Sequence, residues 1–267
     1  MEARRREDFP AEGKSMSISR FTTLFVMIFL ISPVACLAQS QFTEGMKEAA
    51  GPKNEYIVSV QELRMSDTGR KAFAKGAALL GKGDTAASLA YFDQAIEEFP
   101  GFYKAYYDLG VAHFRLGHTV EAEQAFQKSI NLTGGGYAPP EFGMGMVLCE
   151  TQELEKAETV LQRGLDLEPG SATGKYFLGL AQFGLNHLVE AERSLRQALL
   201  RRANFPQAYL LLARIHQRQN NSPALVEDLQ AYLKLDRHSR DSKQVRALLE
   251  QTQQTRNQQA SAAHPPY

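Results

Sequence analysis

Apolar residues recur along this chain at helical spacing and also at a longer, fixed period. A column of small residues is spaced 34, 35, 34 and 34 positions apart, at Gly76, Gly110, Gly145, Gly179 and Ala213. A column of large apolar residues keeps the same spacing, at Phe92, Phe126, Leu161, Leu195 and Leu229. A third column follows them, at Pro100, Gly134, Pro169, Ala203 and Arg237. Three columns in register predict five stacked repeats, each one supersecondary unit long.

Each unit contains two stretches with the apolar spacing of a helix. In the second unit these predict helices over 103–115 and 119–131. Gly110 and Ala122 lack bulk and permit close helix approach, while Phe126 fills the gap beside them. A large residue at Gly110 is therefore expected to overpack. Glycines at 81, 83, 117 and 184 are expected to end first helices, and Pro100 and Pro169 to end second helices.

These columns resemble the tetratricopeptide repeat. The second unit carries Tyr106-x₂-Leu109-Gly110-x₂-His113 and then Ala122-x₃-Phe126, close to the family pattern W-x₂-L-G-x₂-Y, A-x₃-F and P over 34 residues. Tyrosine replaces the tryptophan, and histidine replaces the tyrosine. The resemblance implies an all-α fold, a right-handed α-solenoid of about five helix-turn-helix repeats with a C-terminal capping helix. The chain resembles an exported bacterial member of the family.

The period also sets the expected domain boundaries. The solenoid covers 69–239, in units 69–102, 103–136, 138–171, 172–205 and 206–239. A capping helix is expected over 241–256 and a disordered tail over 257–267. Before the repeats, 39–66 is expected to be an extended leader lying along the first of them.

The first 38 residues have the layout of an export signal. An apolar run over 21–37 follows basic residues, and Cys36-Leu37-Ala38 places small residues where a signal peptidase reads. We expect a signal peptide over 1–38, cut after Ala38, with Met16 as an alternative start. Two other interpretations stay open, an uncleaved membrane anchor and a lipoprotein acylated at Cys36. The expected location is periplasmic or secreted, with a membrane-anchored lipoprotein as the alternative.

Composition argues against several classes of chemistry. Lys and Arg number 30 and Asp and Glu number 30, so the basic excess of a nucleic-acid-binding protein is lacking. The two cysteines, Cys36 and Cys149, form neither a disulfide framework nor a zinc motif. The six histidines never occur as H-E-x-x-H, G-x-S-x-G does not occur, and Gly134-Gly135-Gly136 lacks a following G-K-[ST]. The sequence predicts no enzyme, no cofactor, no metal site and no small-molecule substrate.

The resemblance implies that the first helices line a concave groove that binds a protein or peptide. Carried onto this chain, the partner-binding residues are Phe73, Tyr107, Phe114, Arg115, Phe142, Tyr176 and Phe183. Packing between repeats is an equal alternative for these aromatic side chains. A clamp for a terminal carboxylate is disfavoured, because its lysine and asparagine positions hold residues such as Phe73, Ala77 and Val111.

The expected function is a non-catalytic scaffold for a polypeptide partner in envelope assembly or secretion. The ligand is expected to be an apolar segment with nearby acidic residues, since basic residues fall near the groove, at Arg70, Lys104, Arg115, Arg214 and Arg218. The alternatives are an accessory subunit of an envelope enzyme and a structural spacer without a groove ligand.

Overall fold

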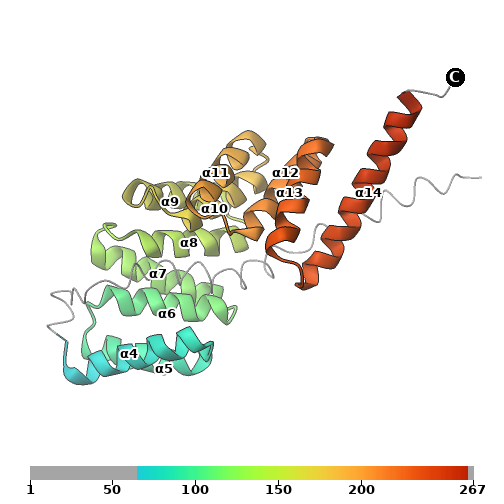
Figure 1. Cartoon of the computed structure of the whole chain (residues 1–267). Coiled ribbons are helices and arrows are strands. Elements are labelled where there is room, and N and C mark those ends of the chain that lie inside the picture. Colours follow the sequence, from blue (N-terminus) through green and yellow to red (C-terminus); the bar gives the residue numbers. More distant parts are fainter. Residues whose placement is uncertain (1–64, 264–267) are drawn as a thin grey trace, which may run out of the picture.

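The computed structural model describes residues 65–263, and within that range it contains eleven helices and no strand. They form a curved array of hairpins with a last helix at one end (Figure 1). The helices are α4 (Asp67–Lys82), α5 (Thr85–Glu98), α6 (Tyr103–Arg115), α7 (Thr119–Thr133), α8 (Ala138–Glu150), α9 (Leu154–Leu167), α10 (Ala172–Gly184), α11 (Leu188–Arg201), α12 (Pro206–Arg218), α13 (Ser222–Leu235) and α14 (Arg240–Ala263).

Five consecutive hairpins, from α4–α5 to α12–α13, correspond to the five predicted units. Each helix packs mainly on the one before and the one after it, and the first helices also contact one another in sequence from α4 to α12. The first helices therefore lie closest together and line the inner side of the curve. The all-α repeat solenoid predicted from the period is confirmed.

The small and large columns meet inside each hairpin. A Cβ built at Gly110 would lie 2.8 Å from Cδ1 of Phe126, and one built at Gly145 would collide with the side chain of Leu161. Phe126 and Leu161 are both fully buried. Only a residue without a side chain lets the two helices approach this closely, which is the overpacking expected at Gly110.

A left-handed residue closes the turn inside every hairpin. These residues form another column at the repeat period, Gly83, Gly117, Gln152, Asn186 and Asn220. The prediction that Gly184 ends its helix through a left-handed conformation is wrong, because Asn186 takes that conformation with φ of 63°. Gly184 is glycine for another reason: a Cβ there would lie 2.6 Å from Cδ1 of Leu154.

The extra residue between the second and third units lies in a glycine turn. Gly134 ends α7 in the left-handed conformation, and Gly135 follows with φ of 77°. Tyr137 then precedes α8, which has proline in its first turn. The three glycines thus form the turn between the second and third repeats.

Two arginines join neighbouring first helices at their C-terminal ends. Arg115 donates from Nη1 to the carbonyl oxygen of Leu80 at 2.8 Å, and Arg218 donates to that of Phe183 at 3.2 Å. Both pairs are 35 residues apart, so the same position is used in two different repeats. A cation at a helix C-terminus also meets the negative end of the helix dipole.

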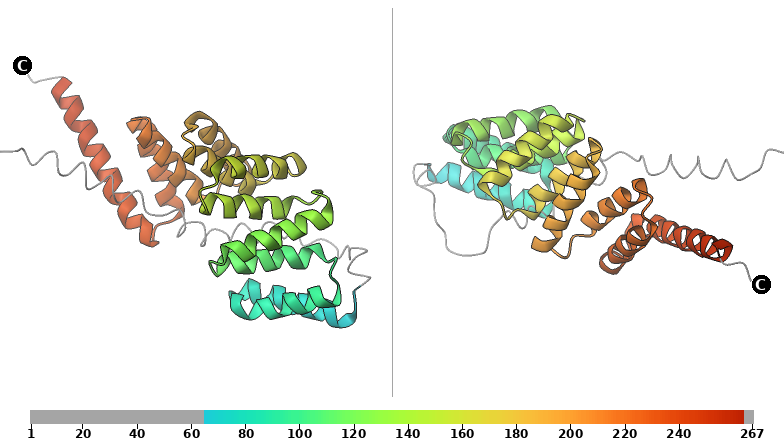
Figure 2. Two further views of the ribbon diagram at one scale, coloured as in Figure 1. Left: turned by 180° about the vertical axis from the view of Figure 1, so that it is seen from behind. Right: turned by 90° about the horizontal axis from the view of Figure 1, so that it is seen from above.

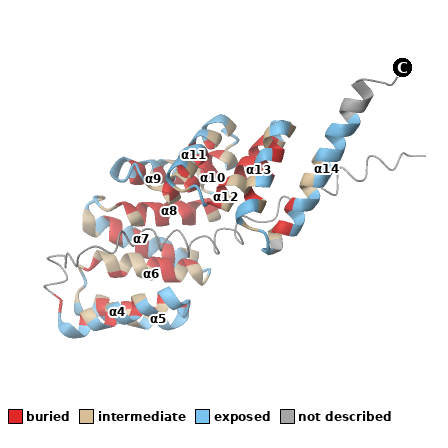
Figure 3. Cartoon of the chain, viewed as in Figure 1, coloured by how far each residue is buried: buried red, intermediate tan, exposed pale blue. Residues whose placement is uncertain are grey.

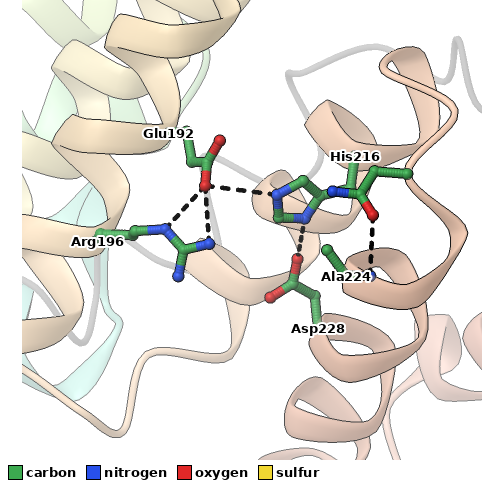
Figure 4. Close-up of polar contacts among 6 residues, drawn as sticks. Glu192, Arg196, His216, Ala224 and Asp228 are labelled. Atoms are coloured by element: carbon green, nitrogen blue, oxygen red, sulfur yellow. Dashed lines mark hydrogen bonds and ion pairs between the residues drawn. The ribbon is translucent and has the colours of Figure 1, made fainter.

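Polar side chains connect the last repeats in a pattern that recurs with the period. In the earlier junction Gln182 donates to Glu158 and accepts from Ser194. One repeat later His216 occupies the place of Gln182; its Nδ1 lies 2.6 Å from Oδ2 of Asp228, and its Nε2 lies 3.5 Å from Oε1 of Glu192 (Figure 4). Arg196 holds Glu192 from the same helix. His216 is therefore buried between two repeats with both ring nitrogens near carboxylates.

The last helix covers the fifth repeat and then leaves the array (Figure 2). Val245 is buried against α13, with Leu248 and Leu249 beside it. Beyond Val245, most side chains of α14 as far as Gln258 are exposed (Figure 3). Helix α14 extends to Ala263, whereas the sequence predicts a disordered tail from residue 257.

The predicted signal peptide, leader and final residues lie outside the described range. Across 65–263, no helix combines the length and the apolar character needed to span a membrane.

Candidate partner-binding face

Three of the predicted partner-binding aromatic residues, Phe73, Tyr107 and Tyr176, pack between repeats. The ring of Phe73 lies 4.7 Å from that of Phe102, and the ring of Tyr176 lies 4.9 Å from that of Phe205. Tyr107 lies 6.0 Å from Tyr137 in the same way. In each pair a first-helix aromatic meets the aromatic residue that precedes the next first helix, and such pairs contribute about 0.5–1.5 kcal/mol beyond burial. Inter-repeat packing therefore accounts for these contacts.

Phe142 fills the same position in the third repeat but has no aromatic partner there, because Ser171 stands in its place. Its ring lies instead against two glycines. A Cβ at Gly164 would be 2.6 Å from Cε1 of Phe142, and one at Gly174 would collide with the same ring. The side chain is therefore part of the core rather than a free binding surface.

The seven predicted partner-binding residues thus divide into two groups. Phe114, Phe142 and Tyr176 are buried, whereas the other four keep accessible surface at the first-helix face, namely Phe73, Tyr107, Arg115 and Phe183. The guanidinium carbon of Arg218 lies 3.9 Å from the centre of the Phe183 ring. The surface left for a ligand is half-buried aromatic surface edged by arginine.

Asp108, on the same helix as Tyr107, was not predicted. Burial raises the pKa of its carboxyl group to about 7, although the charges of Arg115 and Lys104 act in the opposite direction. Burial also raises the pKa of Tyr107, and the charge of Asp108 adds to that rise. Sequence periodicity gives no indication of this site, because the burial of the Asp108 side chain depends on how the repeats curve.

A further polar residue on the first helices, Glu150, was also missed, whereas Arg214 was predicted to lie near the groove. Oε2 of Glu150 and Nε of Arg214 are buried without a hydrogen-bond partner in the described structure. Burial raises the pKa of Glu150 and lowers the pKa of Arg214. Glu150 ends α8, and Arg214 lies in α12.

The chemistry of the remaining candidate groups is limited. Cys149 is buried, and burial raises the pKa of its thiol to about 12, so the nucleophilic thiolate is scarce at neutral pH. His113 lies with Nδ1 3.4 Å from Nδ1 of His118. Within residues 65–263, no three histidine, cysteine or acidic side chains gather as metal ligands.

Comparison with known proteins agrees with the repeat fold. Residues 73–137 match the family model described as tetratricopeptide repeat. No curated protein matches the sequence.

Solved structures of the same architecture cover most of the chain. MamA from Desulfovibrio magneticus RS-1 is 22% identical with a TM-score of 0.57, covering 67% of this chain and 99% of its own. PilF from Pseudomonas aeruginosa is 16% identical with a TM-score of 0.61, covering 75% and 94%. YrrB, described as a repeat protein with an unusual peptide-binding site, is 17% identical with a TM-score of 0.53, covering 67% and 90%. At these identities the likeness is one of fold.

Proposed function

The chain carries tetratricopeptide repeats, and from that premise we propose that it is a non-catalytic scaffold that binds a polypeptide partner through its first-helix face. Proteins built of such repeats bind protein or peptide partners along the surface that the curve encloses. We also propose that the chain acts in envelope assembly or secretion, in the periplasm or outside the cell. It follows from the export signal expected over 1–38.

One observation carries the proposal of a binding face. Phe73, Tyr107 and Phe183 retain accessible aromatic surface on three first helices. The Arg218 guanidinium lies over the Phe183 ring, and the charge of Arg115 acts on Tyr107. Aromatic residues and arginine are the side chains most enriched where proteins bind one another. The peptide-binding site reported for YrrB supports a peptide ligand for a fold of this kind.

Peptide binding tests this proposal directly. A peptide library is screened against the purified chain, and the selected peptides are titrated against Tyr107→Ala/Phe183→Ala. We expect at least a tenfold loss of affinity, because truncating a central interface aromatic costs 2 kcal/mol or more. Phe142→Ala is unsuitable, since that ring fills the core.

The matched control is Val120→Ala/Val189→Ala, which removes two exposed apolar side chains from the second helices α7 and α11. Equal binding by the folded aromatic variant and the control would contradict the first-helix face as the binding surface.

The scaffold and its two alternatives, an accessory subunit of an envelope enzyme and a structural spacer, predict different partners in the native envelope. Crosslinking followed by affinity capture returns a defined polypeptide if the chain is a scaffold, an enzyme complex if it is an accessory subunit, and no stable partner if it is a spacer. The last outcome would contradict the proposal.

A further inference from the structure

Glu150 and Arg214 each hold a polar atom that is buried and unsatisfied. Oε2 of Glu150 accepts no hydrogen bond and Nε of Arg214 donates none in the described part of the chain. Such atoms are uncommon in folded proteins, because each loses its water without compensation. A bound molecule that supplied a donor to the one and an acceptor to the other would remove both penalties.

The two residues lie on the first-helix face, on either side of α10. Glu150 ends α8, α8 contacts α10, and α10 contacts α12, which carries Arg214. Between them α10 presents Phe183 at its C-terminal end, under the guanidinium of Arg218. Packed helices lie about 8–10 Å apart, so two helix steps separate the two groups by roughly 20 Å.

An extended polypeptide can span this distance. At about 3.3 Å per residue, roughly six residues cover 20 Å. The residues in the middle of such a segment would cross Phe183, whose ring keeps accessible apolar surface.

The charges of the two groups are opposite. The carboxyl group of Glu150 has no ion-pair partner in residues 65–263. Arg214 feels the charges of Asp241 and Arg218 and the hydroxyl of Tyr176, with no ion pair to any of them. A cation next to Glu150 and an anion next to Arg214 would each gain strength from the local absence of water.

We propose that the polypeptide ligand is an extended segment with a basic and an acidic side chain about six residues apart, read by Glu150 and Arg214 on either side of an apolar residue at Phe183. This inference rests on the proposed function and assigns its ligand class.

Charge-exchanged peptides test it. The probes are two fluorescent eight-residue peptides with Lys and Glu six positions apart around a central leucine, one in each order, and a third with glutamine at both charged positions. We expect the better charged peptide to bind at least tenfold more tightly than the neutral one, and Glu150→Gln/Arg214→Gln to abolish that difference. Glu155→Gln/Arg193→Gln, on exposed sites of α9 and α11, should leave it unchanged.

Thermal stability separates binding from a structural role. If the two charges serve a ligand, Glu150→Gln/Arg214→Gln should melt no lower than the wild type, since it removes two charges that are partly withdrawn from water. A lower melting temperature with unchanged peptide preference would overturn the inference. So would charged and neutral peptides of equal affinity for the wild type.

The two proposals fail separately. Peptides whose affinity falls for Tyr107→Ala/Phe183→Ala but is unchanged for Glu150→Gln/Arg214→Gln would contradict this inference alone. Absence of binding by every peptide in the library would contradict both.

Discussion

Asp108 shows how a single residue acquires chemistry from the curve of the array. It lies among Tyr107, Arg115 and Lys104 on the first-helix face, and burial dominates over both positive neighbours. A carboxyl group of this kind holds its proton more tightly in the folded state than in the unfolded chain. The folded state therefore binds more protons between about pH 4 and pH 7.

Asp108→Asn is expected to change how stability depends on pH. In the wild type the contribution of Asp108 is present at low pH and is lost as the pH rises through about 7, because ionisation then favours the unfolded chain. Asparagine stays neutral. The variant should gain stability over the wild type at pH 8 and not at pH 4, measured by urea unfolding.

Asp93→Asn is the control, since Asp93 is exposed on α5. Parallel stability profiles for the wild type and Asp108→Asn across this range would contradict the burial of Asp108 as the cause.

Residue by residue, the sequence predicted contacts within a hairpin better than contacts across the face. Gly110 meets Phe126 at a fixed offset along the chain, so the period reveals the pair. Tyr176 meets Phe205 across a repeat boundary, and the burial of Glu150 and Arg214 depends on three helices at once. Periodicity alone does not distinguish a side chain that faces a groove from one that fills the next boundary.

At the scale of elements, the helices α11, α12 and α13 are joined through one buried histidine. His216 lies between Glu192 of α11 and Asp228 of α13, and Arg196 of α11 pairs with Glu192. Burial raises the pKa of Asp228, and the hydrogen bond with His216 partly offsets that rise. The pair is therefore sensitive to loss of either partner.

His216→Leu should destabilise the chain by about 3 kcal/mol, because it leaves the carboxylate of Asp228 buried without its partner. The double variant His216→Gln/Asp228→Ser should lose less, since it copies the amide and hydroxyl pair of Gln182 and Ser194. Guanidinium unfolding measures both. His238→Leu, at an exposed site, is the control, and equal losses in the single and double variants would contradict this account.

Helix boundaries were predicted well wherever glycine, proline or the period marked them. First helices begin at Tyr103, Ala138, Ala172 and Pro206, the starts of the predicted units. The stop at Gly184 was assigned to the wrong mechanism, because Asn186 also tolerates a left-handed backbone. The end of α14 was misplaced, since a polar helix without a stop signal resembles a tail in composition.

At the scale of the whole molecule, each repeat depends on its neighbours for a core, and the fifth depends on α14. Val245 is buried against Leu229 and Tyr232 of α13, with Leu248 and Leu249 at the edge of the same cluster. Residues 253–258 of α14 are exposed.

Val245→Asp should cost about 3 kcal/mol, from lost apolar burial and a buried charge without a partner. Because repeats couple to nearest neighbours, hydrogen exchange should quicken in α12 and α13 and stay unchanged in α4 and α5. Gln253→Asp, on the exposed part of α14, should change neither. Uniform quickening along all five repeats would contradict nearest-neighbour coupling.

The close contact of the Phe142 ring with Gly174 also distinguishes the fourth unit from the fifth as a neighbour for the third. Arrays of similar repeats can misfold by packing one unit on the wrong neighbour. The fourth unit receives the Phe142 ring at Gly174 behind Ser171, whereas the fifth unit has Ala208 and Phe205 at those two places. A third unit that skipped its neighbour would drive the ring into a methyl group and a second ring. The contact between Phe142 and Gly174 thus favours packing of the third unit on the fourth over packing on the fifth.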